Sequence, residues 1–406
     1  MPIGSDKGNF IKPGFLPLTV GPLWQQYSGK WNPQTQGQAN AAGTWAQPPS
    51  SKRFTWGGGA SGQTGLGNTT LYSSPVQAGT DTWADVATGW YAGGGIKSTG
   101  TLWMWGANGS GRLGIGASGG VSAPTQVGAL TNWLKVSCTY SSYGIKTDGS
   151  LWAWGLNSKG QLGQGNTTTV SSPVQVGALT DWLATASSYG FAIMTKTDGT
   201  LWAMGRNHHG QLGDGTIADR NSPVQIGALT DWLSIACGQY TSFGVRSSGT
   251  MYSWGISSTG NFAPNLGQNR SGAPSSSSPT QIGALTTWLA VAAGTYNILA
   301  VKTDGTLWAW GVNGFGTANN ASSPVQVGAA TTWTNKIAAG SGAAGGDTMM
   351  AGIQSDGTLW TWGYNNYGQL GDGSTVTTSA PAKVGVLTTW LSVSAGKGGV
   401  QARGFI

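Results

Sequence analysis

The side chains that could perform acid–base or metal chemistry are few in this chain of 406 residues. It contains no Glu, so its 13 acidic residues are all Asp, and its only two His are the neighbours His208 and His209. Two adjacent His without a nearby Cys or a third His supply neither the ligands nor the geometry of a zinc site, and a Ser-His-Asp arrangement would depend on the same pair. We therefore expect no catalytic residues, no metal site and no cofactor.

Two glycine-rich patterns are compatible with ligand binding but are better explained as turns. Asp214 and Asp372 stand within Gly-Asp-Gly, which is compatible with calcium, yet the equivalent positions elsewhere carry Gln164 and Gln268. The run 57–59, Gly-Gly-Gly, is not followed by the Gly-Lys-Ser/Thr that a phosphate-binding loop requires. We expect loop geometry to account for both patterns.

The elements that would position any site form an internal repeat. With 70 Gly, the chain cannot sustain long helices at reasonable cost, so turns and strands are expected. Repeating strand units with a period near 50 residues predict the blades of a β-propeller. The dipeptide Trp-Gly, or Met-Gly in one unit, marks seven such units, at Trp56, Trp105, Trp154, Met204, Trp254, Trp310 and Trp362.

The unit around residues 197–236 shows how a blade is expected to form. Asp198-Gly199 is typical of a tight hairpin turn, because Gly adopts positive φ without strain. In the strand that follows, Leu201 and Ala203 share one face, and Trp202 and Met204 share the other. Pro223 has no N–H for a strand ladder, which places it at a strand start or a blade edge.

These residues carry a resemblance to a known family. The pattern Asp-Gly-x-Leu-Trp-x-Trp-Gly-x-Asn-x-x-Gly-Gln-Leu-Gly-x-Gly, followed by Pro-Val and a later Trp, resembles the RCC1 repeat over residues 51–406. The resemblance implies an all-β fold, a seven-bladed β-propeller. The sequences of the repeats most resemble the RCC1-type repeats of bacterial and tailed-phage proteins. The sequence departs from the pattern at Gly59, in an insertion at 261–278, and at 312–321, where Gln-Leu-Gly is lost.

The two ends of the repeat region are each incomplete. Residues 52–56 begin with a Trp-Gly strand that no Trp-Leu-x-Val-Ala unit precedes, whereas residues 390–406 contain that unit with no Trp-Gly strand after it. We expect the two halves to complete one blade, which would remove the free sheet edges.

The two Cys occupy one slot of the repeat, five residues after the Trp of the Trp-Leu segment. Cys138 and Cys237 stand where other units carry the small residues Thr88, Ser187, Ala293 and Ala395. Because they lie two blades apart, we expect buried free thiols and no disulfide.

Residues 1–50 do not match the repeat and are rich in Pro, Gly, Gln and Asn. Aromatic side chains recur in this segment and are costly to leave in water, so we expect an extended arm that docks along a partner or along the propeller. Together with one aromatic of the propeller, they are the predicted partner-binding residues: Phe10, Phe15, Trp24, Tyr27, Trp31, Trp45 and Trp90. Trp90 is included because it lies outside the repeat slots that hold 18 of the 22 Trp and that we expect to pack within or between blades.

Charge and hydropathy limit the partners. The net charge is +7, but the cations are scattered, with Lys52 and Arg53 the only adjacent pair, so we expect no nucleic-acid partner. No run of about 18 apolar residues exists, and the first residues lack an apolar segment of the secretory kind. We expect no membrane insertion and no cleaved signal.

These observations favour a non-enzymatic structural or attachment protein of a virion: a fibre, baseplate or capsid-surface component. Its arm would contact other structural proteins of the assembly, and its propeller would bind a host-surface glycan or protein. The alternative is a sugar- or protein-binding propeller of the bacterial envelope, cell surface or cytoplasm, or a secreted one. A guanine-nucleotide exchange factor, the activity for which the RCC1 family is named, is disfavoured because the insertion at 261–278 has no acidic residue.

Overall fold

The computed structural model describes residues 51–256, 266–268, 275–311, 321–340 and 348–406. The predicted arm at 1–50, with its six candidate aromatic residues, lies outside the described residues, as do most of the departures at 261–278 and 312–321. Strands dominate the described ranges, and the single helical element among them is the 3-10 turn η2 (Gly109–Gly111). None of the described helical structure therefore has the length or apolarity of a membrane span.

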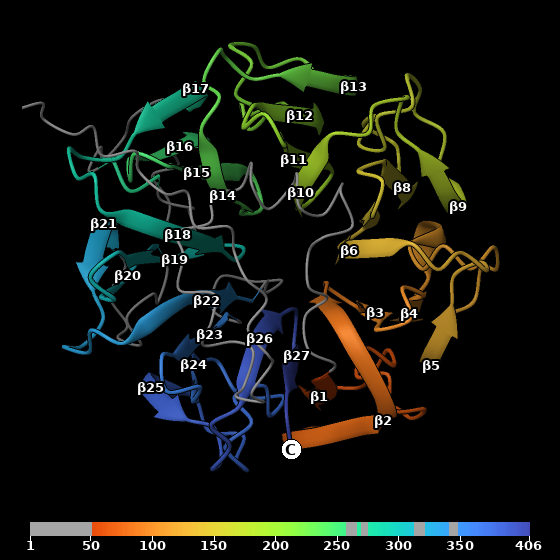
Figure 1. Ribbon diagram of the computed structural model, residues 1–406, viewed down its shortest axis with the longest axis vertical. Helices are drawn as coiled ribbons and strands as arrows, with labels where there is room; N and C mark the ends of the chain where they lie inside the picture. Colours follow the sequence, from red (N-terminus) through yellow and green to blue (C-terminus); the bar gives the residue numbers. More distant parts are fainter. Residues whose placement is uncertain (1–50, 257–265, 269–274, 312–320, 341–347) are drawn as a thin grey trace, which may run out of the picture. The chain divides into compact units, whose positions relative to one another are not determined.

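Five blades are separate four-stranded antiparallel sheets, each built from consecutive strands. Figure 1 shows them in a ring, with the first strand of each sheet nearest the centre and the fourth at the rim. The sheets are β6 (Trp133–Cys138), β7 (Ser141–Lys146), β8 (Leu151–Gly155) and β9 (Val170–Gln175); β10 (Trp182–Ser187), β11 (Phe191–Lys196), β12 (Leu201–Gly205) and β13 (Arg220–Gln225); β14 (Trp232–Cys237), β15 (Thr241–Arg246), β16 (Met251–Gly255) and β17 (Ser276–Gln281); β18 (Trp288–Ala293), β19 (Asn297–Lys302), β20 (Leu307–Gly311) and β21 (Ala321–Gln326); and β22 (Trp333–Ala339), β23 (Met349–Gln354), β24 (Leu359–Gly363) and β25 (Thr378–Lys383).

The other two blades share one long strand and so form a single seven-stranded sheet. Strand β2 pairs with β1 through its first half, where Val76 faces Thr55, and with β3 through its second half, where Val86 faces Gly95. Counting β2 once for each blade gives seven blades of four strands, which confirms the predicted all-β seven-bladed propeller. In sheet order, the strands are β26 (Trp390–Ala395), β27 (Gly399–Gly404), β1 (Ser51–Gly57), β2 (Tyr72–Thr88), β3 (Ala92–Lys97), β4 (Leu102–Gly106) and β5 (Val121–Gln126).

Strands from opposite ends of the described chain meet in this sheet. β1 pairs with β27 in continuous antiparallel register, from Lys52 opposite Gly404 to Gly57 opposite Gly399. β26, β27, β1 and the first half of β2 thus make one blade, and both edges of β1 are hydrogen-bonded.

The turn between the second and third strands is held by side chains as well as by backbone. In the turn before β8, Asp148 Oδ1 accepts hydrogen bonds from the backbone N and the Oγ of Ser150, at 2.9 and 2.6 Å. Ser150 Oγ in turn accepts a hydrogen bond from Trp152 Nε1 at 2.9 Å. The same chain of bonds recurs at Asp198, Asp304 and Asp356, which explains the repeated wording Asp-Gly-Thr-Leu-Trp.

The loop from the third to the fourth strand is organised by its amide side chains. Asn157 Oδ1 accepts a hydrogen bond from the backbone N of Leu162 at 2.9 Å, and its Nδ2 donates to Thr168 O, also at 2.9 Å. Gln161 Oε1 accepts from the backbone N of Lys159 at 2.8 Å. Since these bonds satisfy buried backbone groups, the Asn and Gln of the motif are structural.

The Trp of the Trp-Gly dipeptide joins neighbouring blades. Trp154 is fully buried, and its Nε1 donates to the main-chain O of Arg112 in the preceding blade at 2.9 Å. Trp56 makes the same bond to Gln369 O across the joint between the sixth and seventh blades. A Cβ at Gly114 would lie 2.7 Å from the indole Nε1 of Trp154, so this loop position has no room for a side chain. The repeated Trp are therefore packing residues, as their slots predict.

Candidate functional site

The two adjacent His side chains make separate contacts. His208 Nε2 lies 3.4 Å from Asp219 Oδ2, whereas the ring of His209 packs edge-on against Tyr240 with centroids 5.1 Å apart. Burial lowers the pKa of His209, and the positive charges of Arg206 and His208 lower it further. Within the described ranges, no three His, Cys or Asp side chains gather as metal ligands.

Asp214 is engaged within its own loop, which agrees with the turn interpretation of Gly-Asp-Gly. Its Oδ2 accepts a hydrogen bond from Arg220 Nε at 2.7 Å, and its Oδ1 accepts from Asn207 Nδ2 at 3.0 Å. Thr216 adds bonds to Oδ1 from its backbone N and from its hydroxyl. The carboxylate of Asp214 therefore stabilises the conformation of its own loop.

The two Cys are buried free thiols, as their small-residue slot predicts. Burial raises the pKa of Cys138 to about 12 and raises that of Cys237 as well. A thiol that stays protonated at neutral pH is a poor nucleophile and a poor metal ligand, so neither residue is a candidate for covalent catalysis.

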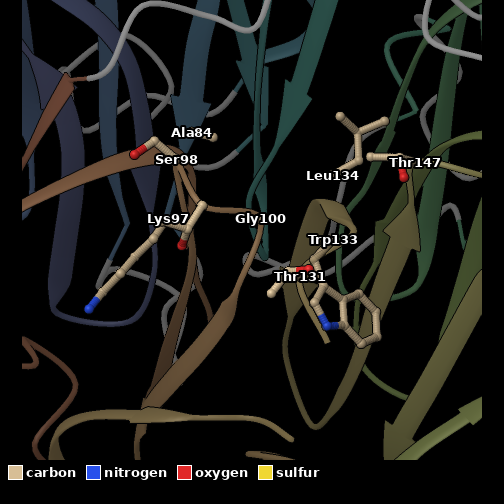
Figure 2. Close-up of a pocket in the computed structure, with 9 residues that line it drawn as sticks. Ala84, Lys97, Ser98, Gly100, Thr131, Trp133, Leu134 and Thr147 are labelled. Carbon is tan, nitrogen blue, oxygen red and sulfur yellow. The ribbon is translucent and has the colours of Figure 1, made fainter. Parts of the chain in front are cut away.

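A small hollow lies between the first two blades of the chain order, at the end where the Asp-Gly turns emerge. Figure 2 shows Lys97, Ser98 and Gly100 on one side and Thr131 and Trp133 on the other. Its volume is about 150 Å³, well under the roughly 300 Å³ at which small-molecule sites begin. We do not regard it as a ligand site.

At this same end, the repeated Lys side chains are used in packing. Lys146 Nζ lies 3.5 Å from the ring centroid of Trp152 and 5.0 Å from that of Trp133. Equivalent cation–π contacts are made by Lys97, Lys196 and Lys302. Contacts of this kind stabilise a blade. Lys97 and Lys196 are also paired with Asp81 and Asp181, at 2.9 and 3.3 Å.

The opposite end of the blades carries a different arrangement. Because successive strands are antiparallel, the first-to-second and third-to-fourth strand loops emerge together there. An aromatic row runs across the first-to-second strand loops and is compact at its Trp90 end: Trp90 to Tyr140 at 5.3 Å, Tyr140 to Tyr189 at 5.3 Å, Trp90 to Tyr189 at 6.4 Å, and Tyr189 to Tyr240 at 6.1 Å between ring centroids. Tyr91 contacts Trp90 at 6.4 Å. All five are half-buried.

Three cations lie on these rings. Arg112 Cζ is 4.7 Å from the centroid of Tyr140, and Arg206 Cζ is 5.2 Å from that of Tyr240 and 5.7 Å from that of Tyr189. Lys397 Nζ donates a hydrogen bond to Tyr91 Oη at 2.8 Å and lies 5.8 Å from the centroid of Trp90. We call the set Trp90, Tyr91, Arg112, Tyr140, Tyr189, Arg206, Tyr240 and Lys397 the Trp90 cluster.

The electrostatics of the Trp90 cluster are set at Tyr140 and Arg112, which lie against one another. Burial raises the pKa of Tyr140, and although Arg112 opposes this, neighbouring Tyr91 and Tyr189 add to it. Burial lowers the pKa of Arg112, but an arginine remains protonated at neutral pH. This pair therefore presents a neutral ring beside a fixed positive charge.

Exposed apolar residues also occur at the end with the Asp-Gly turns, but they are isolated. Leu179 is 47% exposed and Leu130 is 48% exposed, each in the turn that leads into the next blade. Single exposed leucines are normal on protein surfaces. They carry less weight than an aromatic row whose members touch.

Sequence reasoning singled out Trp90 but missed the other members of the cluster. A signal was present, because in five of the seven units an aromatic residue stands seven or eight positions after the Trp of the Trp-Leu segment or its equivalent, as in Trp133 to Tyr140 and Trp232 to Tyr240. The cations gave no such signal, since they come from loops of different kinds. That Trp90 contacts a partner stays a prediction.

Comparison with known proteins identifies the family of this chain. Two models of the regulator of chromosome condensation (RCC1) repeat together cover more than half of it. They match residues 99–142, 148–193, 198–245 and 356–401, and 232–261 and 288–317. The chain belongs to the RCC1-repeat family.

Solved structures of RCC1-like propellers have the same fold at low sequence identity. Prp20p from Saccharomyces cerevisiae is 18% identical, with a TM-score of 0.74 over 88% of this chain and 92% of that one. Yeast RCC1 (Prp20) in the structure with bound Kap60 is 17% identical, with a TM-score of 0.75 over 88% and 89% of the two chains. Human WBSCR16 is 18% identical, with a TM-score of 0.76 over 88% and 99%. Trp90 lies outside all ranges matched by the RCC1-repeat models, whereas Tyr140, Tyr189 and Tyr240 lie inside them.

Proposed function

We propose that this RCC1-repeat propeller is a non-enzymatic binding protein that holds a protein partner on the Trp90 cluster. The observation that carries the proposal is the row of touching, half-buried rings with three cations stacked on them. Trp, Tyr and Arg are the side chains that most often dominate the binding energy of protein interfaces. No arrangement of described residues offers a competing catalytic centre.

The fold relatives support a protein partner. Prp20p is characterised by its binding to Gsp1p and histones, and it has been solved with Kap60. These partners belong to Prp20p, and what carries over to this chain is the proposal that a propeller of this fold works by binding proteins.

The test is loss of partner capture when the cluster is changed. The double variant Trp90→Gln and Tyr189→Gln should lose the partner that the unchanged protein retains, as measured by quantitative cross-linking and mass spectrometry in the native source. The double variant Leu179→Ser and Leu229→Ser removes exposed apolar side chains at the other end of the blades and should retain it. Equal retention by both variants would contradict the proposal.

A more specific role, predicted from the wording of the repeats and from the arm, is that of a virion component anchored through residues 1–50. Deleting residues 1–48 should then leave a folded propeller that is missing from purified virions, as judged by mass spectrometry. Normal incorporation would rule out anchoring by the arm. Retention on a glycan array would favour the envelope or secreted alternative, and tight binding to a nucleotide-free GTPase would favour the exchange factor.

A further inference from the structure

Two guanidinium groups of the Trp90 cluster have hydrogen-bonding capacity that nothing in the described ranges uses. Arg112 is only 6% exposed, and one of its terminal nitrogens, Nη1, is buried without a hydrogen-bond acceptor. Arg206 Nε is buried in the same condition. Buried charged donors are normally paired, and a guanidinium stacked on a ring keeps its in-plane N–H groups available to a carboxylate. No acceptor among the described residues reaches either of these two nitrogens.

The carboxylates that the structure describes at the same end are engaged elsewhere. Asp214 accepts from Arg220 at 2.7 Å, and Asp219 lies within 4 Å of His208 and Lys159. None of the ion pairs in the described part of the chain includes a cation of the Trp90 cluster. The cluster therefore carries three positive charges that no described carboxylate within 4 Å neutralises.

The rings at the Trp90 end of the row form a compact group. Trp90 and Tyr189 each lie 5.3 Å from Tyr140 and 6.4 Å from one another, as measured between ring centroids. Tyr240 adjoins this group at 6.1 Å from Tyr189. The three mutually contacting rings thus offer one apolar surface on which a large side chain can pack, with the cations beside it.

Building on the function proposed above, we propose that the Trp90 cluster binds an acidic segment of a partner protein, with Asp or Glu carboxylates accepting hydrogen bonds from Arg112, Arg206 and Lys397 and a large apolar side chain packed on the rings. The chain's own arm does not fit this description, because residues 1–50 contain one Asp, Asp6, and three Lys. The occupant is therefore a second protein.

The charge can be removed with side chains that other blades already carry in the same slots. Arg112→Gln introduces the residue of Gln161, Arg206→Leu that of Leu156, and Lys397→Gln that of Gln239. Each replacement is thus compatible with the fold. The matched control is Lys383→Gln on the outer strand β25, which removes one exposed cation far from the rings.

The experiment is selection of a random-peptide display library on the full-length protein, on the triple variant and on the control. The unchanged protein and the control should enrich segments in which Asp or Glu flanks an aromatic residue or Leu. For a selected peptide, fluorescence anisotropy should show that each cation removed weakens the affinity about tenfold, which is the fold-change of one charge-assisted hydrogen bond. High salt should also weaken binding of the peptide to the unchanged protein.

Enrichment of basic or uncharged segments, equal enrichment on the triple variant, or no enrichment at all would overturn the acidic-segment proposal. So would binding of a neutral glycan in place of a peptide at the same rings. The cross-linking test separates the two levels: if the natural partner is lost with Trp90→Gln and Tyr189→Gln but kept by the triple charge variant, the binding function stands and the partner's chemistry is wrong.

Discussion

Trp154 illustrates what a single repeated residue does in this propeller. Its side chain is fully buried, packs edge-to-face on Trp133 at 6.1 Å and donates to the main-chain O of Arg112 in the preceding blade. One residue thus contributes apolar burial, an aromatic contact and a hydrogen bond across a blade joint. Trp56 and Trp105, in the same slot, likewise combine burial, an aromatic contact and a hydrogen bond to a main-chain O of the preceding blade.

Trp154→Ala should lower the free energy of unfolding by about 3 to 5 kcal/mol, because it leaves a large cavity and an unpaired backbone carbonyl. Urea denaturation followed by circular dichroism measures the change. Leu179→Ala, at a 47% exposed position, should change the free energy by less than about 0.5 kcal/mol. Equal losses in the two variants would mean that the blades are not held together in this way.

The buried thiol of Cys138 makes stability fall at alkaline pH. Its pKa is raised to about 12 in the folded chain, whereas an unfolded Cys ionises near 8.5. Between these values, the unfolded state binds fewer protons than the folded state, so the free energy of unfolding decreases as pH rises. Cys138→Ala, which introduces the side chain found at Ala293, should flatten the decrease between pH 9 and about 11. An unchanged slope would show that the thiol already ionises in the folded protein.

At the scale of elements, the Asp-Gly turn is both a conformational and a packing requirement. Gly149 has φ +78°, and a Cβ at this position would collide with the main-chain O of Thr180. Gly177 has φ +60° but no atom within 4 Å of the position of a Cβ. A side chain at Gly177 would therefore meet backbone strain alone, whereas one at Gly149 would meet strain and steric overlap together.

Gly177→Ala should cost about 1 to 2 kcal/mol, the penalty of a left-handed residue with a side chain. Gly149→Ala should cost more, since the turn leading into the next blade must also shift. Thermal unfolding of the two variants gives the comparison. A Gly149→Ala variant as stable as Gly177→Ala would show that the contact with Thr180 is easily relaxed.

The strands and turns were predictable from sequence because their causes are local. Asp198-Gly199 and the alternation from Leu201 to Ala203 report backbone requirements within a few residues. Arg53 was not predictable: its position in β1 corresponds to Leu151 in β8, yet it is fully buried and donates to Thr64 O and Gly65 O while stacking on a Trp ring. A charged side chain in a core slot depends on the neighbouring blade, which sequence spacing does not reveal.

The Trp90 cluster was only partly predictable from the sequence, because its members come from different blades. Trp90 stands out in the sequence because it is a Trp outside the three Trp slots of the repeat. Tyr140 and Tyr189 share its position in the repeat, but their contacts form only when the ring brings three blades together. Arg206 and Lys397 lie far apart in sequence and join the cluster through different loops. Their proximity is a property of the assembled ring.

At the scale of the whole molecule, ring closure makes that proximity possible. Lys397 follows β26, in the blade that β1 completes, and its Nζ reaches Tyr91 in the next blade. The pairing of β1 with β27 therefore fixes one end of the aromatic row as well as the sheet. Function, in this account, depends on the closed ring and on one of its two ends.

The most direct measurement is electron microscopy of the protein bound to its natural partner, at a resolution that traces side chains. Binding at the Trp90 cluster should give partner density on Trp90, Tyr140 and Tyr189, with a carboxylate within hydrogen-bond distance of Arg112 or Arg206. Partner density confined to the outer strands or to the end with the Asp-Gly turns would contradict it.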